Sequence, residues 1–208
     1  MVFQPTIIAE VYIIWEMINL KDKRFDKTEA ALKSAITELL RTKNINEITV
    51  VELCRLAGVN KSTFYLHYRD IYEYYDYLIQ DIATRHRSIY EKYNYEEFVN
   101  LFPDIFVNVL NIIKQDELMK IMISRDNSNV LISKVTESIT EAIIAKKSTW
   151  YENILQTEMN CRFIVFGTMG VIQGYSDMIF SNPDIAKPLA ERIKAGFIEA
   201  GKNPDLSD

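Results

Sequence analysis

The feature that most constrains this 208-residue chain is the block at residues 49–68, TVVELCRLAGVNKSTFYLHY, in which two short helical patterns flank one glycine. Thr49 is a good cap for the first helix, and Glu52 is placed three positions later to complete a capping box. Gly58 follows the last apolar position of that helix, where a residue free to adopt positive φ can reverse the chain. The block therefore predicts a helix-turn-helix unit, an arrangement that places one helix in the DNA major groove.

The second helix of the unit is expected at residues 61–68, with Asn60 as its cap. Phe64 and Tyr68, at i and i+4, give it an inward face. The outward face combines short hydroxyls, one cation and two hydrogen-bonding rings, which suit phosphates and base edges: Lys61, Ser62, Thr63, Tyr65 and His67. Leu66, an apolar side chain on the same surface, either contacts a thymine methyl or only packs.

Residues 24–78 resemble the DNA-binding domain of the TetR family of bacterial transcriptional regulators. The resemblance is carried by an amphipathic helix at residues 30–40 and by the turn and second helix at residues 57–68, with Thr63, Tyr65 and Tyr68 at the family's spacing. The resemblance implies that Thr63, Tyr65 and His67 face the DNA, with Lys61 and Ser62 at the leading end of the second helix. It also implies that Thr49 holds a phosphate at the start of the first helix. Many family members place a lysine that contacts a phosphate where this chain has Ile71. Arg69 is the residue that could reach the same DNA backbone in its place.

Two simpler interpretations stay open at this stage. A helix, a glycine turn and a second helix also form ordinary corners in all-α proteins. Tyr65 and His67 could equally be solvated side chains without a DNA contact.

The net charge of −5 is unusual for a nucleic-acid binder until it is divided along the chain. Residues 21–70 carry 10 Lys and Arg against 7 Asp and Glu, whereas the rest carries 14 against 22. A basic module on an acidic body is typical of a protein that binds DNA with one end only, and dimerisation would double its phosphate contacts.

No catalytic or metal chemistry is expected. Cys54 and Cys161 stand apart on apolar helical patterns, as buried reduced thiols of a cytoplasmic protein do. His67 and His86 have no second ligand at metal spacing, and no nucleophile motif, phosphate loop or acid-base carboxylate pair is found. We therefore expect no cofactor and no metal.

The N-terminal stretch is apolar at residues 7–18, but it is too short for a membrane span and contains two glutamates. It also lacks the features of a signal peptide. We expect an amphipathic extension at residues 1–20 and no membrane association.

The remainder of the chain keeps helical periodicity, so the fold class is all-α: a three-helix DNA-binding domain at residues 21–70 and a helical ligand-binding and dimerisation domain at residues 71–201. A connecting helix is expected from Asp70 to about residue 93. Pro103 and two polar clusters suggest breaks, with helices near residues 96–114, 116–123 and 130–146. Further helices are expected at 156–180 and from Pro188 to about residue 196.

Three glycines at i, i+3 and i+7 mark the helix at residues 156–180: Gly167, Gly170 and Gly174. Glycine costs up to about 1 kcal/mol in a helix interior, so close approach of another helix is the expected compensation. The same helix of a second subunit is the expected partner, with Ile193 and Phe197 of the last helix in the same four-helix interface. The alternative is that the glycines make room for a core side chain.

The TetR resemblance implies a homodimer that binds a palindromic operator and is released by a small apolar or aromatic effector held among the helices of the body. Aromatic and methionine side chains are the candidate pocket walls, and each is equally a core residue: Phe102, Phe106, Met122, Phe163 and Phe166. A repressor is the favoured hypothesis. An activator, or a regulator controlled by a protein coregulator, is the second, and a body without a sizeable cavity would favour it. An all-helical enzyme or carrier is the third, although no catalytic side chains are identified for it.

Overall fold

The computed structural model describes residues 26–124, 129–146 and 154–201, and within these ranges the regular secondary structure is helical, as predicted. The chain divides into two compact units, Met1–Tyr74 and Tyr75–Asp208. The expected extension at residues 1–20 lies outside the described residues.

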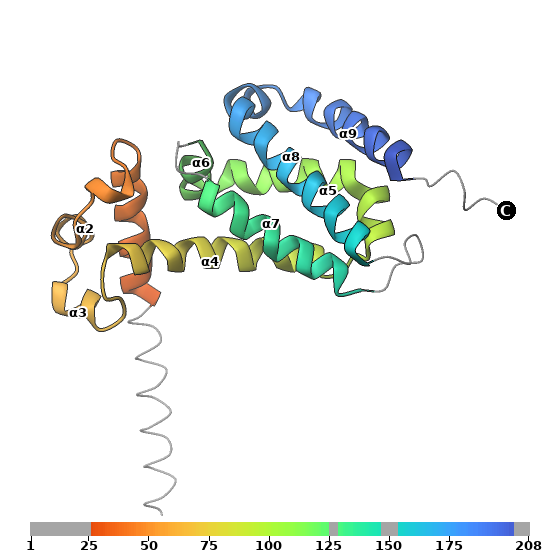
Figure 1. Cartoon of the computed structure of the whole chain (residues 1–208). Coiled ribbons are helices and arrows are strands. Elements are labelled where there is room, and N and C mark those ends of the chain that lie inside the picture. The colour runs from red at the N-terminus through yellow and green to blue at the C-terminus, as the bar shows by residue number, and fades with distance from the viewer. Residues whose placement is uncertain (1–25, 125–128, 147–153, 202–208) are drawn as a thin grey trace, which may run out of the picture. The chain divides into compact units, whose positions relative to one another are not determined.

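The first unit is built from short helices (Figure 1). A helix at residues 26–40 is followed by a 3-10 turn, η1 (Ile45–Glu47), and then by α2 (Val50–Ala57) and α3 (Lys61–Tyr65). Helices of this length are marginal in isolation, so their stability depends on a shared apolar core. That core includes Leu32, Ile36, Leu40, Ile48, Leu53 and Phe64, all at most 4% exposed.

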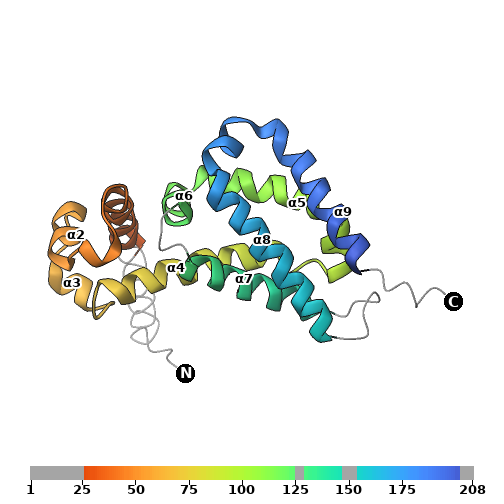
Figure 2. The ribbon, with the colours of Figure 1, turned by 45° about the horizontal axis from the view of Figure 1, so that its top comes forward.

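The second unit holds the longer helices. Helix α4 (Ile71–Tyr90) begins in the first unit and continues into the second, where α5 (Tyr95–Gln115), α6 (Glu117–Ser124), α7 (Asn129–Ile144), α8 (Ile154–Ser181), η2 (Pro183–Ile185) and α9 (Ala186–Gly201) follow. Helix α9 lies alongside α5, and α7 lies alongside α8 (Figures 1 and 2). These pairs enclose a core of aliphatic and aromatic side chains, with α5 alone contributing ten buried residues.

Helix α5 matches the helix predicted near residues 96–114 and runs through Pro103, so Pro103 does not introduce the break that it suggested in the sequence. Asn94 and Glu97 form a reciprocal capping box at its start, with the Asn94 side chain accepting from the Glu97 N–H at 2.9 Å. A proline inside a helix costs roughly 3 kcal/mol. The continuous buried face of α5 offsets that cost, because each buried large apolar side chain contributes about 1.5–3 kcal/mol.

Helix α8 is longer than predicted and is not regular throughout. Tyr175, directly after Gly174, has φ −133° and ψ 19°, which is outside the helical range. The kink therefore lies within the glycine-containing part of the helix, at a position consistent with the low helix propensity of glycine.

Candidate nucleic-acid interface

The turn between α2 and α3 has the geometry that the sequence predicts. Gly58 adopts the left-handed conformation, with φ 64° and ψ 27°, and ends α2 by donating its N–H to backbone carbonyls of the last turn. Asn60 then caps α3, with its side-chain oxygen accepting from the Ser62 N–H at 3.2 Å. Because only glycine adopts this φ without a steric penalty, Gly58 sets the angle between the two helices.

The start of α2 differs from the expectation in one respect. Thr49 Oγ1 accepts from the Glu52 N–H at 3.2 Å, as a helix cap should. The capping box is incomplete, because the Glu52 carboxylate accepts from Lys43 Nζ at 2.6 Å instead. The charged ammonium of Lys43 is a stronger donor than the Thr49 backbone N–H, and it therefore takes the Glu52 carboxylate that the capping box would need.

Three aromatic rings and one carboxylate anchor α3 from behind. The Phe64 ring lies 5.5 Å from that of Tyr68 and 5.9 Å from that of Tyr74, and the three side chains are at most 7% exposed. The hydroxyls of Tyr68 and Tyr74 both donate to Glu29, at 2.8 and 3.1 Å. The inward face predicted from the sequence is confirmed, whereas the contact of both tyrosines with Glu29 was not predicted.

The outward face of this segment is open to solvent. Lys61, Ser62 and His67 are exposed, Thr63 is half-buried, and Tyr65 is 55% exposed. Regular helix ends at Tyr65, three residues earlier than predicted, but the Tyr68 N–H still bonds to the Phe64 carbonyl at 3.0 Å. The side chains predicted to meet DNA therefore lie on one continuous helical turn and its extension.

Arg69 is held close to this face by Glu73. The Arg69 Nε lies 3.1 Å from the Glu73 carboxylate, which also accepts from the Arg69 backbone N–H. The backbone hydrogen bond from Arg69 lowers the pKa of Glu73, and the guanidinium adds to the effect. Arg69 remains 84% exposed, so its other donors face solvent.

A small cavity lies in the core of the second unit. Its volume is about 20 Å³, close to that of one water molecule, and its walls include His86, Tyr90, Phe102, Phe106 and Met169. Met122 is buried but does not line it. Phe163 and Phe166 are 68% and 51% exposed and also lie outside it, because they are on the outer side of α8. The pocket predicted from sequence is thus only partly assembled by the fold.

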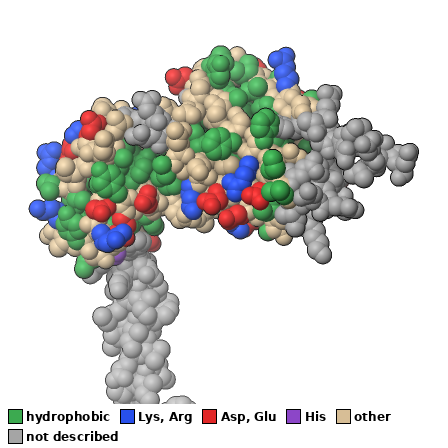
Figure 3. Space-filling view, viewed as in Figure 1, with side chains coloured by type: hydrophobic (Ala, Val, Ile, Leu, Met, Phe, Trp, Pro, Cys, Tyr) green, Lys and Arg blue, Asp and Glu red, His purple; other side chains and the backbone are tan. Residues whose placement is uncertain are grey.

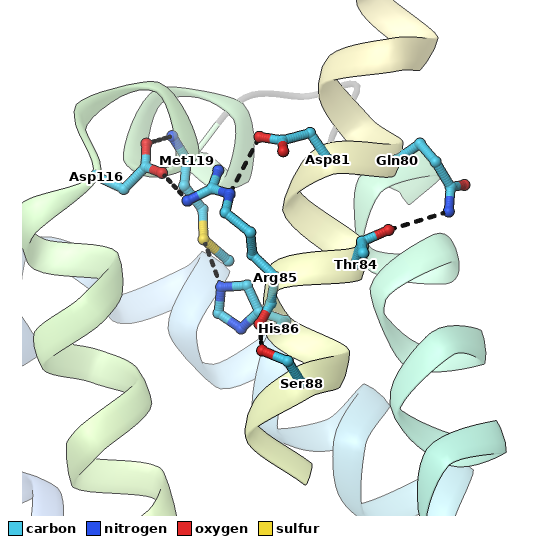
Figure 4. A network of polar contacts seen from close by, with 8 residues as sticks. All are labelled: Gln80, Asp81, Thr84, Arg85, His86, Ser88, Asp116 and Met119. Atoms are coloured by element: carbon cyan, nitrogen blue, oxygen red, sulfur yellow. Dashed lines mark hydrogen bonds and ion pairs between the residues drawn. The ribbon is translucent and has the colours of Figure 1, made fainter. Parts of the chain in front are cut away.

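His86 is a polar residue in the lining of this cavity, and it was not predicted to be a pocket residue. Its Nε2 lies 3.0 Å from the sulfur of Met119, and burial lowers the pKa of His86 to about 4, with Arg85 contributing in the same direction (Figure 4). Arg85 in turn bridges Asp81 at 3.1 Å and Asp116 at 3.0 Å. This network ties α4 to the start of α6.

A second hollow lies on the surface between α4 and the start of α7. It is an open groove of about 480 Å³ with mixed walls: Asp76, Ile79, Gln80, Asn129, Val130, Ser133, Lys134 and Glu137. Its lining residues recur at helical spacing on each helix, but they are mostly polar or charged, so they form no apolar stripe from which the sequence could predict a groove.

The outer side of α8 exposes several large apolar side chains, and Figure 3 shows hydrophobic patches among polar and charged side chains on this face of the second unit. The exposed side chains are Leu155, Met159, Phe163, Phe166 and Met178, at 51–68%. The three glycines of α8 are also exposed, and no described atom lies within 4 Å of a Cβ built on any of them. They therefore do not make room for a described core side chain of the same chain. Ile193 of α9 is half-buried, and the side chain of Phe197 lies outside the described part.

The described residues include no helix long and apolar enough to cross a membrane. They also contain no group of three or more potential metal ligands. Both cysteines are buried and free, and burial raises the pKa of Cys161 to about 12.

Comparison with known proteins identifies the fold. No protein-family model matches the sequence, and no curated protein is significantly similar to it. The crystal structure of the TetR family repressor AlkX from Dietzia sp. strain DQ12-45-1b, implicated in biodegradation of n-alkanes, matches with a TM-score of 0.51 and 16% identity over 82% of this chain and 95% of that one. The dihydroxyacetone kinase operon activator DhaS matches with a TM-score of 0.51 and 13% identity over 84% and 96%. The chain thus has a TetR-like fold.

Proposed function

We propose that this protein is a TetR-like, DNA-binding transcriptional regulator, whose α3 enters the major groove of its operator. The observation that carries the proposal is the outward face of α3, which exposes Lys61, Ser62, Tyr65 and His67 while Phe64 is fully buried behind them. Hydroxyl, ring and ammonium groups on one rigid surface suit contacts with phosphates and base edges. Thr49, Thr63 and Arg69 extend the same proposed contact surface.

We further propose that two copies bind a palindromic operator as a homodimer. The exposed apolar stripe of α8 supports this, because isolated soluble units rarely leave so many large apolar side chains uncovered. Gly167, Gly170 and Gly174 would allow two such helices to approach closely, and Ile193 and Phe197 of α9 would complete the interface. A two-fold dimer presents two α3 helices to half-sites one helical turn, about 34 Å, or a multiple of it apart.

Regulation is proposed to work by a small apolar or aromatic effector that releases the repressor from DNA. The aromatic walls of the cavity, Phe102 and Phe106 among them, suit such a ligand, although the cavity must expand from its present 20 Å³ to admit one. For a hundredfold loss of operator affinity, the effector must favour the released state by about 2.7 kcal/mol. Helix α4 is the element through which we propose that the two units are coupled.

The small cavity also favours a second candidate, in which a protein coregulator replaces the small effector or the protein acts as an activator. DhaS, one of the similar structures, is an operon activator. A thermal-shift screen against small aromatic and aliphatic compounds separates the candidates, because a tight ligand raises the melting temperature by mass action.

The test of DNA binding is a titration of wild type and Tyr65→Ala on DNA from upstream of the protein's own gene, at two salt concentrations. We expect tight binding that weakens steeply with salt, since each neutralised phosphate releases counterions. Tyr65→Ala should bind at least tenfold more weakly if the ring contributes about 1.4 kcal/mol to the complex.

Tyr77→Ala is the matched control, because Tyr77 is an exposed tyrosine of the second unit and is not part of the proposed contact surface. Unaltered affinity in this variant would assign the loss to α3. If wild type bound no fragment more tightly than random DNA, even among fragments selected from a random library, the proposal would be rejected.

A further inference from the structure

We propose that Leu66 reads a thymine in each half-site of the operator through an apolar contact with the C5-methyl group of that base. The assignment rests on the proposed function, since it requires α3 to enter the major groove. Leu66 is 79% exposed, more than any other large hydrophobic side chain of the described residues. It therefore does not pack against the described residues of its own chain, which leaves the contact with a thymine methyl as the interpretation that we develop.

The backbone at Leu66 is held in place, so its exposure is not a frayed end. Leu66 has φ −72° and ψ −21°, and its N–H bonds to the carbonyls of Ser62 at 3.2 Å and Thr63 at 3.3 Å. Buried Phe64 and Tyr68 lie two residues away on either side. An apolar side chain presented to solvent from a fixed backbone suits a partner that offers an apolar group at a fixed position.

The surface around Leu66 is compatible with a polyanion. No Asp or Glu occurs at residues 61–69, which contain Lys61 and Arg69. The nearest carboxylates on the C-terminal side are engaged: Asp70 Oδ1 accepts from the N–H groups of Tyr72 and Glu73, each at 2.9 Å, and the Glu73 carboxylate is bonded to Arg69. Phosphates can therefore approach this surface without meeting an unpaired acid from these positions.

Thymine is the base that an apolar side chain can distinguish in the major groove. It alone presents a methyl group there, whereas the other bases present hydrogen-bonding groups. Residues 61–67 contain no Arg, Asn or Gln, so Lys61 is the one side chain in this range of a type that makes two-bond contacts with guanine or adenine. A methyl contact from Leu66 would therefore add recognition of thymine to the hydrogen bonds that the polar side chains of this face can make.

The experiment removes the methyl group and nothing else. Wild-type protein first selects its preferred duplex from a random library, and each thymine of that duplex is then replaced in turn by deoxyuridine. At one thymine of each half-site, we expect the replacement to weaken wild-type binding about fourfold, the effect of losing one buried methyl group. Leu66→Ala should bind the thymine and uracil duplexes equally at that position.

Leu101→Ala is the matched control, because Leu101 is an exposed leucine on α5 in the second unit, and it should discriminate as wild type does. The proposal is overturned if every uracil duplex binds wild type as tightly as the parent, or if Leu66→Ala keeps the discrimination. The first arm uses unaltered protein and does not depend on the folding of a variant. A selection that enriches no sequence would instead contradict the proposed function.

Discussion

At the scale of the residue, the presentation of α3 depends on side chains that lie behind it. Glu29 accepts one hydrogen bond from Tyr68 and one from Tyr74, and so joins the helix at residues 26–40 to the end of the α3 segment and to α4. The periodicity of the sequence identified Tyr68 as inward-facing. It could not identify Glu29 as the acceptor, because the three residues are separated by 39 and 45 positions and no local pattern links them.

His86 leads to a prediction about stability and pH. Its pKa is lowered to about 4 in the folded protein, from 6.5, mainly by burial and secondarily by Arg85, while Asp116 acts in the opposite direction. The unfolded chain therefore binds the proton first, and the free energy of unfolding should fall as pH decreases from about 6.5 to about 4. The loss from this group should approach about 3 kcal/mol, at 1.36 kcal/mol for each pKa unit.

Chemical denaturation at several pH values measures the effect, and comparison with His86→Gln isolates it from the titration of carboxylates. Glutamine keeps a hydrogen-bond donor but does not titrate, so its stability should depend less on pH in this interval. His67→Gln, at the exposed histidine of α3's extension, should behave as wild type. Parallel curves for wild type and His86→Gln would show that His86 is not the group responsible.

At the scale of the element, amphipathic periodicity was sufficient to predict the helices and insufficient to predict their irregularities. Helix α7 was expected at residues 130–146 and spans Asn129–Ile144, since its apolar spacing is regular. The helix predicted near residues 96–114 is confirmed as α5, and Pro103, which suggested a break, lies inside it because the buried face around it outweighs the local penalty. The kink at Tyr175 directly follows Gly174, and apolar spacing alone does not encode such a local departure from helical geometry.

The same limit applies to the candidate sites. The outward residues of α3 could be assigned because the motif is local. The pocket could not, since an aromatic residue on an apolar helix faces either the core or the outside of a bundle. Phe106 and Phe163 have similar sequence surroundings, and the structure buries the first and exposes the second.

Gly170 provides a prediction for α8. In an isolated chain, Gly170→Ala meets no neighbouring atom among the described residues and should stabilise the helix by up to about 1 kcal/mol. If the glycine face packs against a second copy, the added methyl group should separate the two helices and raise the dimer dissociation constant roughly tenfold, within the usual cost of overpacking. Sedimentation equilibrium measures the second effect, and unfolding at concentrations where the protein is monomeric measures the first. An unchanged dissociation constant would exclude Gly170 from the interface.

At the scale of the whole molecule, the charge distribution agrees with a protein that meets DNA through one unit. The basic residues exceed the acidic ones at residues 21–70, and the remaining chain is acidic enough to make the net charge −5. Repulsion between that acidic remainder and phosphates would orient the encounter. Two such chains, joined through α8 and α9, would present two basic units to one duplex.

The most direct test of this account is a hydroxyl-radical footprint of the full chain on a duplex that it selects, with the mass of the complex measured in parallel. We predict two protected patches on one face of the DNA, related by two-fold symmetry and separated by one helical turn or a multiple of it, with two or another even number of chains bound. Protection of a single asymmetric patch by one chain, or no protection at any salt concentration, would contradict it.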